Sequence, residues 1–151
     1  MDRPERFNVL GAQVHALHLT QARDLVIAAA RERATRGAYV CFCDVNSVSC
    51  ARRDPAHLAS LNNAFLTTPD GMPIVWLGRR AGHPRIGRVY GPDLLLEICA
   101  ATAGSGLSHF FYGGGPGTAE ALAANLPARF PGLRIGGVGT PPFRELTSVQ
   151  P

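Results

Sequence analysis

The sequence predicts an α/β fold, in which a Rossmann-like parallel sheet carries helices on both faces. Two short apolar runs, residues 38–43 (AYVCFC) and 107–112 (LSHFFY), are typical of strands that are buried on both sides. Segments with the apolar spacing of helices separate the strand-like runs. Because strands that alternate with helices pair in parallel through right-handed crossovers, the pattern favours one such sheet. With 151 residues, of which 46% are hydrophobic, we expect a single domain over residues 1–151.

The other elements follow the same alternation. Residues 7–10 and 13–19 predict two short strands that can pair as a hairpin. Thr20 predicts the N-cap of a helix over residues 21–36, which Gly37 ends. Further along, the sequence predicts a helix opened by Asn46, a helix over 55–64, a strand over 65–67, helices over 72–80, 91–103 and 118–129, and a strand over 133–138. We expect the apolar residues around Trp76 to pack one helix face.

The formal charge of +4 comes entirely from arginine, because the chain has no lysine. A GC-rich genome produces such a composition, and attraction to phosphates or to an anionic membrane surface is the functional alternative. The arginines are spread along the chain instead of forming one run. We therefore expect no nucleic acid partner.

The cysteines predict neither a disulfide scaffold nor a metal site. Cys41 and Cys43 lie two apart in a predicted strand, so they share a face and are typical of small buried residues. No CxxC pair or clustered histidines indicate metal ligands, and we expect no metal and no cofactor. The first residues lack an apolar core of signal-peptide length, and no segment approaches a membrane span. These features predict a cytoplasmic location, with which binding at the inner face of the cell membrane is compatible.

The stretch from Leu66 to Asp93 (LTTPDGMPIVWLGRRAGHPRIGRVYGPD) is the most informative about function. Asp70 lies on a Pro-Asp-Gly turn directly after a short strand, and Arg88 lies in a second turn. Catalytic groups favour such loops, and a carboxylate with an arginine suits transfer chemistry on a phosphorylated substrate. The structural alternatives are turn chemistry for Asp70, a surface ion pair for Arg88 and a helix N-terminal charge for Asp93.

Two other loops contribute candidate binding residues. Asp44 and Asn46 follow the strand over 38–43 at the expected ligand edge of the sheet, although Asn46 also suits a plain N-cap. A glycine-rich turn with Gly113, Gly114 and Gly115 stands between a strand and a helix, where backbone N–H groups bind phosphate. The turn fits neither a dinucleotide fingerprint nor a P-loop. Diphosphate contact and a purely structural tight turn both remain open.

These segments, in this order, resemble the WecG/TagA/CpsF family of glycosyltransferases. The resemblance covers about residues 38–143, most of the chain, through VCFCDVNSVSCA, PDGMPIVWLGRRAG, RVYGPDLL, FFYGGGPGTAEALAANL and FPGLRIGGVGTPPF. The PDGMP block followed by RVYGPD is the specific part. The glycine turn by itself is a weak signal.

The resemblance implies an inverting enzyme that needs no metal. It would move an N-acetylhexosamine-type sugar, such as N-acetylmannosamine, from a UDP-sugar to a polyprenyl-diphosphate-linked acceptor in surface polysaccharide or teichoic-acid synthesis. Asp70 would be the base that deprotonates the acceptor hydroxyl, and Arg88 would neutralise the donor diphosphate. Asn46, Asp44 and the backbone of residues 113–115 would line the substrate pocket.

Two departures from the family pattern bear on activity. Where many members carry a threonine two residues before the asparagine, this chain has Asp44, a negative charge near an anionic donor. Members also continue past the position of Pro151 through further strands, so we expect the chain to lack the C-terminal part of the family domain. A sheet without its later strands exposes apolar surface, which would favour a homo-oligomer.

Two other functions compete with this hypothesis. The first is a truncated, non-catalytic module that binds a nucleotide sugar. The second is a nucleotide-dependent oxidoreductase on a Rossmann sheet, against which the missing ribose-binding acid argues.

Overall fold

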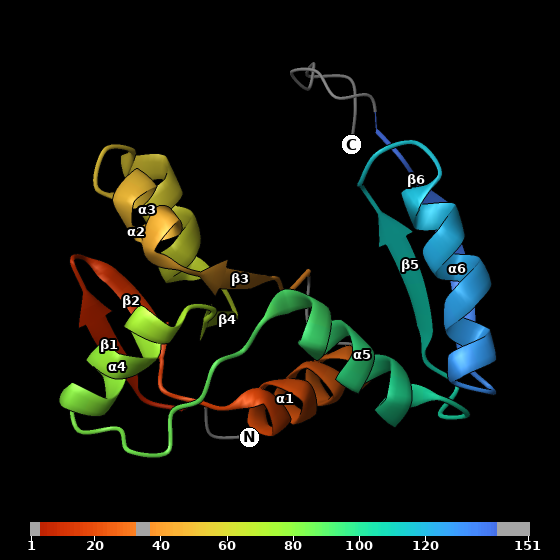
Figure 1. Cartoon of the computed structure of the whole chain (residues 1–151), viewed down its shortest axis with the longest axis horizontal. Helices are drawn as coiled ribbons and strands as arrows, with labels where there is room; N and C mark the ends of the chain where they lie inside the picture. The colour runs from red at the N-terminus through yellow and green to blue at the C-terminus, as the bar shows by residue number, and fades with distance from the viewer. Residues whose placement is uncertain (1–3, 33–36, 142–151) are drawn as a thin grey trace. The chain divides into compact units, whose positions relative to one another are not determined.

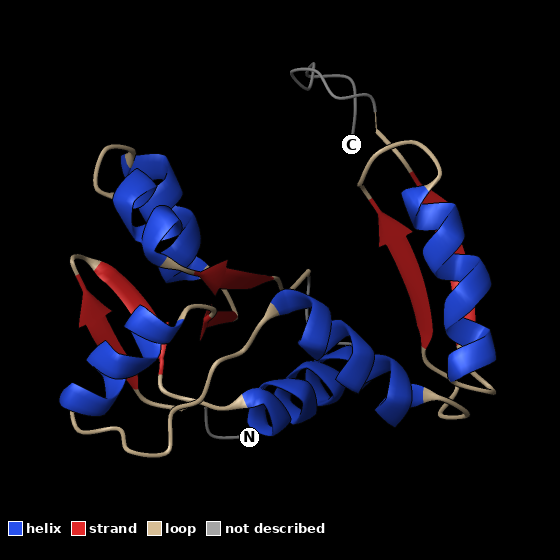
Figure 2. Ribbon diagram, in the orientation of Figure 1, coloured by secondary structure: helices blue, strands red, loops and turns tan. Residues whose placement is uncertain are grey.

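The computed structural model describes residues 4–32 and 37–141. The chain divides into two compact units, Met1–Ile98 and Cys99–Pro151. In both units strands alternate with helices along the chain (Figures 1 and 2). The predicted α/β class, with parallel strands and flanking helices, is confirmed, and the described strands pair two by two.

The first unit begins with an antiparallel hairpin of β1 (Arg6–Val9) and β2 (Ala12–His15), as the sequence predicts. Leu10 and Gly11 form its turn, and both have positive φ angles, 52° and 102°. Two-residue hairpins favour such a turn because its twist matches that of the strands. The side chain of Asn62 holds the hairpin, since its Oδ1 accepts from the N–H of Gln13 at 2.8 Å and its Nδ2 donates to the carbonyl of Gly11 at 3.1 Å.

A parallel pair of strands, β3 (Val40–Cys43) and β4 (Leu66–Pro69), forms the centre of the first unit. The crossover between them contains α2 (Val45–Ala51) and α3 (Pro55–Asn63), whose N-cap Asp54 accepts from two backbone N–H groups. In the strand register Val40 pairs with Leu66 and Cys43 with Pro69. The two strands therefore end level, and the residues that follow them share one edge.

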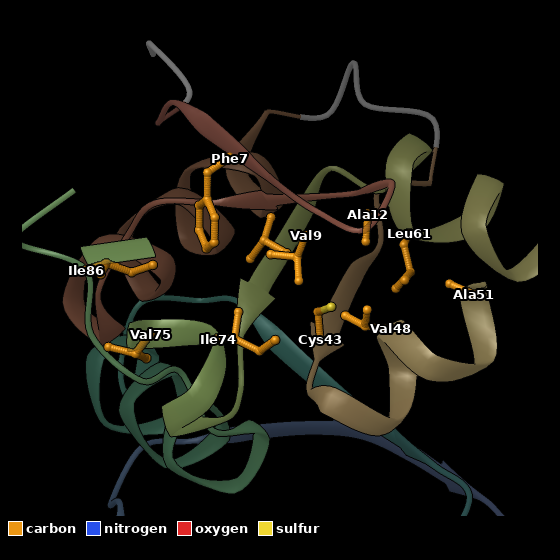
Figure 3. Packing of buried hydrophobic residues seen from close by; sticks show 11 residues of the cluster. Phe7, Val9, Ala12, Cys43, Val48, Ala51, Leu61, Ile74, Val75 and Ile86 are labelled. Carbon is orange, nitrogen blue, oxygen red and sulfur yellow. The ribbon is translucent and has the colours of Figure 1, made fainter. Parts of the chain in front are cut away.

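Both faces of this strand pair are covered, which the apolar sequence of the strands requires. One core packs the hairpin, α2, α3 and α4 (Met72–Arg80) together, and Figure 3 shows side chains from these elements converging. The second core involves α1 (Leu19–Arg31) and the first part of α5 (Gly91–Thr102). Cys41 and Cys43 face the first core, while Val40 and Phe42 face the second.

The thiols of β3 are structural, as predicted. Cys43 is fully buried and Cys41 is half-buried. Loss of hydration raises the pKa of the Cys43 thiol to about 11, with smaller contributions from the charges of Asp44 and Cys41. The thiol therefore stays neutral at physiological pH and packs as a small apolar group.

Two predicted helix starts are wrong by one or two residues. The helix α1 begins at Leu19 with His18 as its N-cap, not Thr20, and the side chain of Gln21 accepts from the His18 N–H at 3.1 Å. The predicted end of this helix lies outside the described residues. The helix α2 is capped by Asp44, not opened by Asn46.

The second unit contains another parallel pair, β5 (Ser108–Tyr112) and β6 (Arg134–Gly139), joined through α6 (Thr118–Arg129). The register shifts between His109 and Phe110, so that β6 has one extra residue at this point. The side chain of His109 contacts the Oγ1 of Thr102 through Nε2 at 2.8 Å, which ties β5 to the end of α5. The unit keeps the strand, turn and helix order that the sequence predicts.

Candidate active site

Asp44 and Asp70 lie at the same edge of the β3–β4 pair. Asp44 follows Cys43 and Asp70 follows Pro69, the two residues that pair at the ends of their strands. The backbone N–H of Asp70 donates to the carbonyl of Cys43 at 3.0 Å, which extends the ladder by one residue. Ligands of open α/β sheets bind at such carboxyl ends of parallel strands.

Gly71 lies between Asp70 and α4, beside Asp44. A Cβ atom built on Gly71 would lie 3.8 Å from the Cβ of Asp44, which is contact distance. Gly71 is also the N-cap of α4, and Pro73 occupies its first turn, where proline needs no hydrogen bond from its nitrogen. The Pro-Asp-Gly turn of the sequence is therefore a strand-to-helix junction with an acid at its centre.

The carboxylate of Asp70 is poorly hydrated. Its side chain is 20% exposed, and its Oδ1 is shielded from solvent without a hydrogen-bond partner among the described residues. Loss of hydration raises the pKa of this carboxyl group above its usual value, the positive charge of Arg88 opposes this, and the charges of Asp44 and Asp93 raise the pKa further. A desolvated carboxylate of raised pKa, with one oxygen that accepts no hydrogen bond from the described residues, is better suited to accept a proton than an ordinary surface aspartate.

Arg88 is held beside Asp70 by the backbone. The N–H of Val89 donates to the carbonyl of Pro69 at 2.8 Å, so the segment runs along the end of β4. Arg88 Nε donates to the backbone carbonyl of Asp70 at 3.2 Å, and Nη2 lies 3.7 Å from Asp70 Oδ1. The guanidinium is 47% exposed, so part of its fork of donors faces solvent and can bind an anion.

Tyr90 and Asp93 also belong to this site, and neither was predicted from the sequence as a functional residue. The guanidinium of Arg88 lies over the Tyr90 ring at 4.5 Å from its centroid, a cation–π contact that orients it. The signal was present, because Arg88 and Tyr90 flank the buried Val89 and so point to the same side. Asp93 lies in the first turn of α5 and acts on Asp70 through its charge.

Asp44 has a structural role in addition to its place in the site. Its Oδ1 accepts from the N–H of Ser47 at 2.7 Å and caps α2. This hydrogen bond lowers the pKa of Asp44, mainly through the backbone N–H of Ser47 and against a cost in hydration. Asp44 is therefore an ionised, fixed negative charge at neutral pH.

Asn46 lies on α2, one residue after the first residue of this helix. It is an exposed residue in the first turn of α2, and its side-chain Oδ1 lies 4.0 Å from the Sγ of Cys50. Its backbone N–H interacts with the carboxylate of Asp44.

The glycine-rich turn belongs to the second unit, after β5. Gly113 and Gly114 have φ angles of 109° and 79°, which favour glycine. The N–H of Gly113 donates to the carbonyl of Gly139 at 2.9 Å, so this N–H continues the ladder with β6. Gly117, the N-cap of α6, provides no side-chain cap, and the N–H groups of Gly114 and Gly115 make no hydrogen bond within the described residues.

An apolar hollow of about 200 Å³ lies elsewhere, at the amino-terminal end of β3 and β4. The described residues that line it are apolar: Val26, Ala29, Ala30, Gly37, Ala38, Val40 and Phe65. We place the candidate site at the opposite edge of these strands, where the charged side chains gather.

The charged edge offers one acid–base group and one anion-binding group. In the described part of the chain, no three His, Cys, Asp or Glu side chains are arranged to hold a metal ion. Asp70 can accept a proton, and Arg88 can stabilise a developing negative charge on a leaving group. This pairing suits the transfer of a group from an anionic leaving group to a hydroxyl.

Comparison with known families decides the assignment. The model of the glycosyl transferase WecG/TagA/CpsF family matches residues 7–150, nearly the whole chain. The chain belongs to this family. No curated protein matched it.

The family assignment makes the protein a member of a glycosyltransferase family. Members act on a sugar donor and an acceptor, and cell-envelope polysaccharide synthesis is the process that the assignment supports. In the described ranges 4–32 and 37–141, none of the helices combines the length and the apolar character needed to cross a membrane.

Proposed function

We propose that this glycosyltransferase moves an N-acetylhexosamine-type sugar, such as N-acetylmannosamine, from a UDP-sugar to a polyprenyl-diphosphate-linked acceptor. The family assignment supports a sugar transfer, and the arrangement at the carboxyl edge of β3 and β4 supports this form of it. The acceptor is lipid-linked, so the protein would work as a peripheral protein at the inner face of the cell membrane.

One observation carries the proposal: the carboxylate of Asp70, whose side chain is 20% exposed, lies beside Arg88 with 3.7 Å between Oδ1 and Nη2, and this Oδ1 has no hydrogen-bond partner among the described residues. A base must have a free lone pair to take a proton, and an oxyanion stabiliser must stand near it. In a merely structural ion pair, the carboxylate oxygens would be satisfied by hydrogen bonds.

In the proposed reaction Asp70 takes the proton of an acceptor hydroxyl. The hydroxyl oxygen then forms a bond to the anomeric carbon of the donor, and the bond from that carbon to the UDP oxygen breaks. This single displacement inverts the configuration at the anomeric carbon. UDP leaves with the electron pair, and the guanidinium of Arg88 stabilises its negative charge.

Donor binding would also tune the base. Arg88 lowers the pKa of Asp70, so a diphosphate that engages the guanidinium weakens this effect and makes the carboxylate more basic. An arginine in this role would allow the reaction to proceed without a metal ion. We propose that Gly114 and Gly115 bind phosphate oxygens through backbone N–H groups, and that Gly113 shapes the turn.

Asp44 and Asn46 would define the substrate side of the site. The fixed negative charge of Asp44 disfavours an anionic donor, so it would favour substrates whose neutral or cationic part faces α2. Asn46 would provide an amide donor and acceptor at the same edge.

The test replaces Asp70 with Asn and measures sugar transfer to a short-chain polyprenyl-diphosphate acceptor. Because general-base help contributes about 10²–10⁴ in rate, kcat should fall by that factor. The amide does not carry the charge whose hydration is lost on folding, so the melting temperature should stay level or rise. UDP titration by calorimetry should give a Kd equal to or lower than that of the parent, because the amide no longer competes with the diphosphate for Arg88.

Two results would contradict the proposal. If Asp70→Asn transferred sugar at the parent rate, Asp70 would not be the catalytic base. Binding of UDP by the parent protein without transfer of any donor sugar would instead identify a nucleotide-sugar-binding module without catalytic activity.

A further inference from the structure

The helix that follows Asp70, α4, carries apolar residues on two opposite faces, one buried and one exposed. Ile74, Val75 and Gly78 of α4 are buried, and a Cβ at Gly78 would clash with Ile86 and Phe7, so this side sits tightly on the core. The opposite side is exposed, against the expectation that Trp76 and its neighbours pack inward. It consists of Met72, Pro73, Trp76, Leu77, Arg79 and Arg80.

The exposure of this face is large for apolar residues. Trp76 is 60% exposed and Leu77 is 47% exposed, and both lie in a single nine-residue helix. An exposed apolar cluster of this kind marks an interaction surface more often than a stable contact with water. At 100° per residue the exposed positions form one continuous arc, so they can meet a flat partner together.

The charges on this face are all positive. From Gly71 to Pro92 the chain has four arginines and no acidic residue. Arg79 and Arg80 form no ion pair within the part of the chain that the structure describes. Their long aliphatic stems can lie beside Trp76 and Leu77 while the guanidinium groups reach anionic groups at the same level.

We propose that this exposed face of α4 docks onto the surface of an anionic lipid bilayer. Tryptophan with arginine is the combination that favours the interface between lipid headgroups and acyl chains. Self-association through this face would bring the like charges of Arg79 and Arg80 of two copies together, whereas anionic headgroups compensate both. The positive charge thus favours lipid over a second copy of this basic chain.

Docking through α4 would bring the candidate site to the membrane. The helix begins at Met72, two residues after Asp70, so the Asp70 edge would lie close to the headgroups. Docking through this surface would explain how the protein reaches the lipid-linked acceptor. Only this explanation rests on the proposed function. The contact itself needs no transfer activity.

Trp76 is the single tryptophan of the chain, so its fluorescence reports on this face alone. We would titrate the full chain with vesicles of equal parts phosphatidylglycerol and phosphatidylcholine, and with vesicles of phosphatidylcholine alone. The proposal predicts a blue shift of the emission, and quenching by brominated acyl chains, with the anionic vesicles. The apparent affinity should fall as salt rises.

Matched variants distinguish binding through this face from a general electrostatic attraction between the basic chain and anionic vesicles. Each arginine near an anionic surface contributes about fivefold in affinity, so Arg79→Gln with Arg80→Gln should weaken binding about 25-fold. Leu77→Ser should weaken it further while keeping the reporter. The controls are Arg52→Gln with Arg53→Gln, another exposed adjacent pair, and Leu10→Ser, another exposed leucine, which should change affinity less than twofold.

Three outcomes would overturn the proposal. In the first, the chain co-floats with anionic vesicles but Trp76 emission does not move. In the second, binding is equal with neutral vesicles and insensitive to salt. In the third, the blue shift appears with rising protein concentration without lipid and the sedimenting mass doubles, which would show that a second copy covers α4. The Asp70→Asn variant should bind anionic vesicles at least as tightly as the parent, because it loses a negative charge near the headgroups, so loss of transfer and loss of docking are separate results.

Discussion

The two parallel strand pairs of this molecule end in different kinds of loop. At the carboxyl edge of β3 and β4 the chain presents charged side chains, Asp44 and Asp70, and the strand β4 is buried throughout. At the carboxyl edge of β5 and β6 it presents glycine backbone, and Phe110 and Tyr112 of β5 are 62% and 64% exposed.

The difference shows two ways to build a binding edge on the same arrangement of strands. Side chains can act as base or ion only if the backbone holds them, and Asp70 is held through Cys43 and Arg88. Glycine provides backbone N–H groups and room for a ligand instead, and it needs φ angles that other residues avoid. We therefore expect substitutions at the first edge to change chemistry, and those at the second to change backbone shape.

The largest effect beyond that of Asp70 should come from Arg88→Gln. Loss of one preorganised group that stabilises developing charge typically lowers kcat about 10²–10³-fold. Arg88 lowers the pKa of Asp70, so its removal should also move the acidic limb of kcat/KM to higher pH, because Asp70 acts as a base only when it is ionised. Steady-state kinetics from pH 4 to 8 would measure both, with ~0.5 pH spacing.

Arg85→Gln is the matched control for this prediction. Arg85 is an exposed arginine three residues earlier in the same basic stretch, and it has no ion pair among the described residues. An equal loss in both variants would assign the effect to overall charge and count against the role of Arg88.

An intermediate effect is expected in the glycine turn. Gly114 has a φ of 79°, and a Cβ there would lie 2.9 Å from the Cβ of Thr118, so Gly114→Ala forces the turn to shift. Such strain costs about 1–2 kcal/mol, and a moved N–H should weaken UDP binding about tenfold. Gly115→Ala meets only the Thr118 Oγ1, at 3.8 Å, and should leave the unfolding free energy within about 0.5 kcal/mol of the parent.

Calorimetry and urea unfolding on both glycine variants would sharpen the comparison of the two edges. Unchanged UDP affinity in Gly114→Ala would leave this turn with a structural role only.

The smallest effect is expected at Asp44, where cap and charge can be separated. Asp44→Ala removes the acceptor for the Ser47 N–H and should cost about 1 kcal/mol of unfolding free energy, whereas Asp44→Asn keeps a good N-cap and should cost less. The pKa of Asp44 is lowered in the folded state, so its stabilisation is present above its unfolded pKa. It is lost as pH falls through the lowered folded pKa.

The difference between Asp44→Ala and the parent should therefore shrink in acid, which urea unfolding at pH 3 to 7 would measure, in ~1 pH steps. Asp44→Thr, which restores the residue that many family members carry, should keep the cap and increase affinity for a UDP-sugar. A cost for Asp44→Asn as large as that for Asp44→Ala would mean that the charge, not the cap, stabilises α2.

Local signals in the sequence predict most of the elements. The strands around Cys43 and Phe111, the helix after the Pro-Asp-Gly turn and the glycine turn all carry their own spacing or turn residues. The burial predicted for the strand around Phe111 is wrong, because Phe111 is buried while Phe110 and Tyr112 on either side of it are exposed. The helix starts near Thr20 and Asn46 were wrong because several capping residues stand close together, and the choice among them depends on backbone angles set by the preceding strand. The prediction that Trp76 packs against the core was wrong, because apolar spacing cannot tell which apolar side of a helix meets the core.

By itself the sequence determined the α/β class, the family and the presence of an acid and an arginine after the fourth strand. These features are encoded in short segments and in the order of those segments along the chain, so they can be recognised without a structure. Only the tertiary structure decided that Asp70 and Arg88, eighteen positions apart, lie 3.7 Å from each other, and that Tyr90 and Asp93 act on them. It also decided which face of α4 is left in solvent. The distance between Asp70 and Arg88, the hydration of Asp70 and the charges around it depend on packing. Packing brings together residues that are far apart in the sequence.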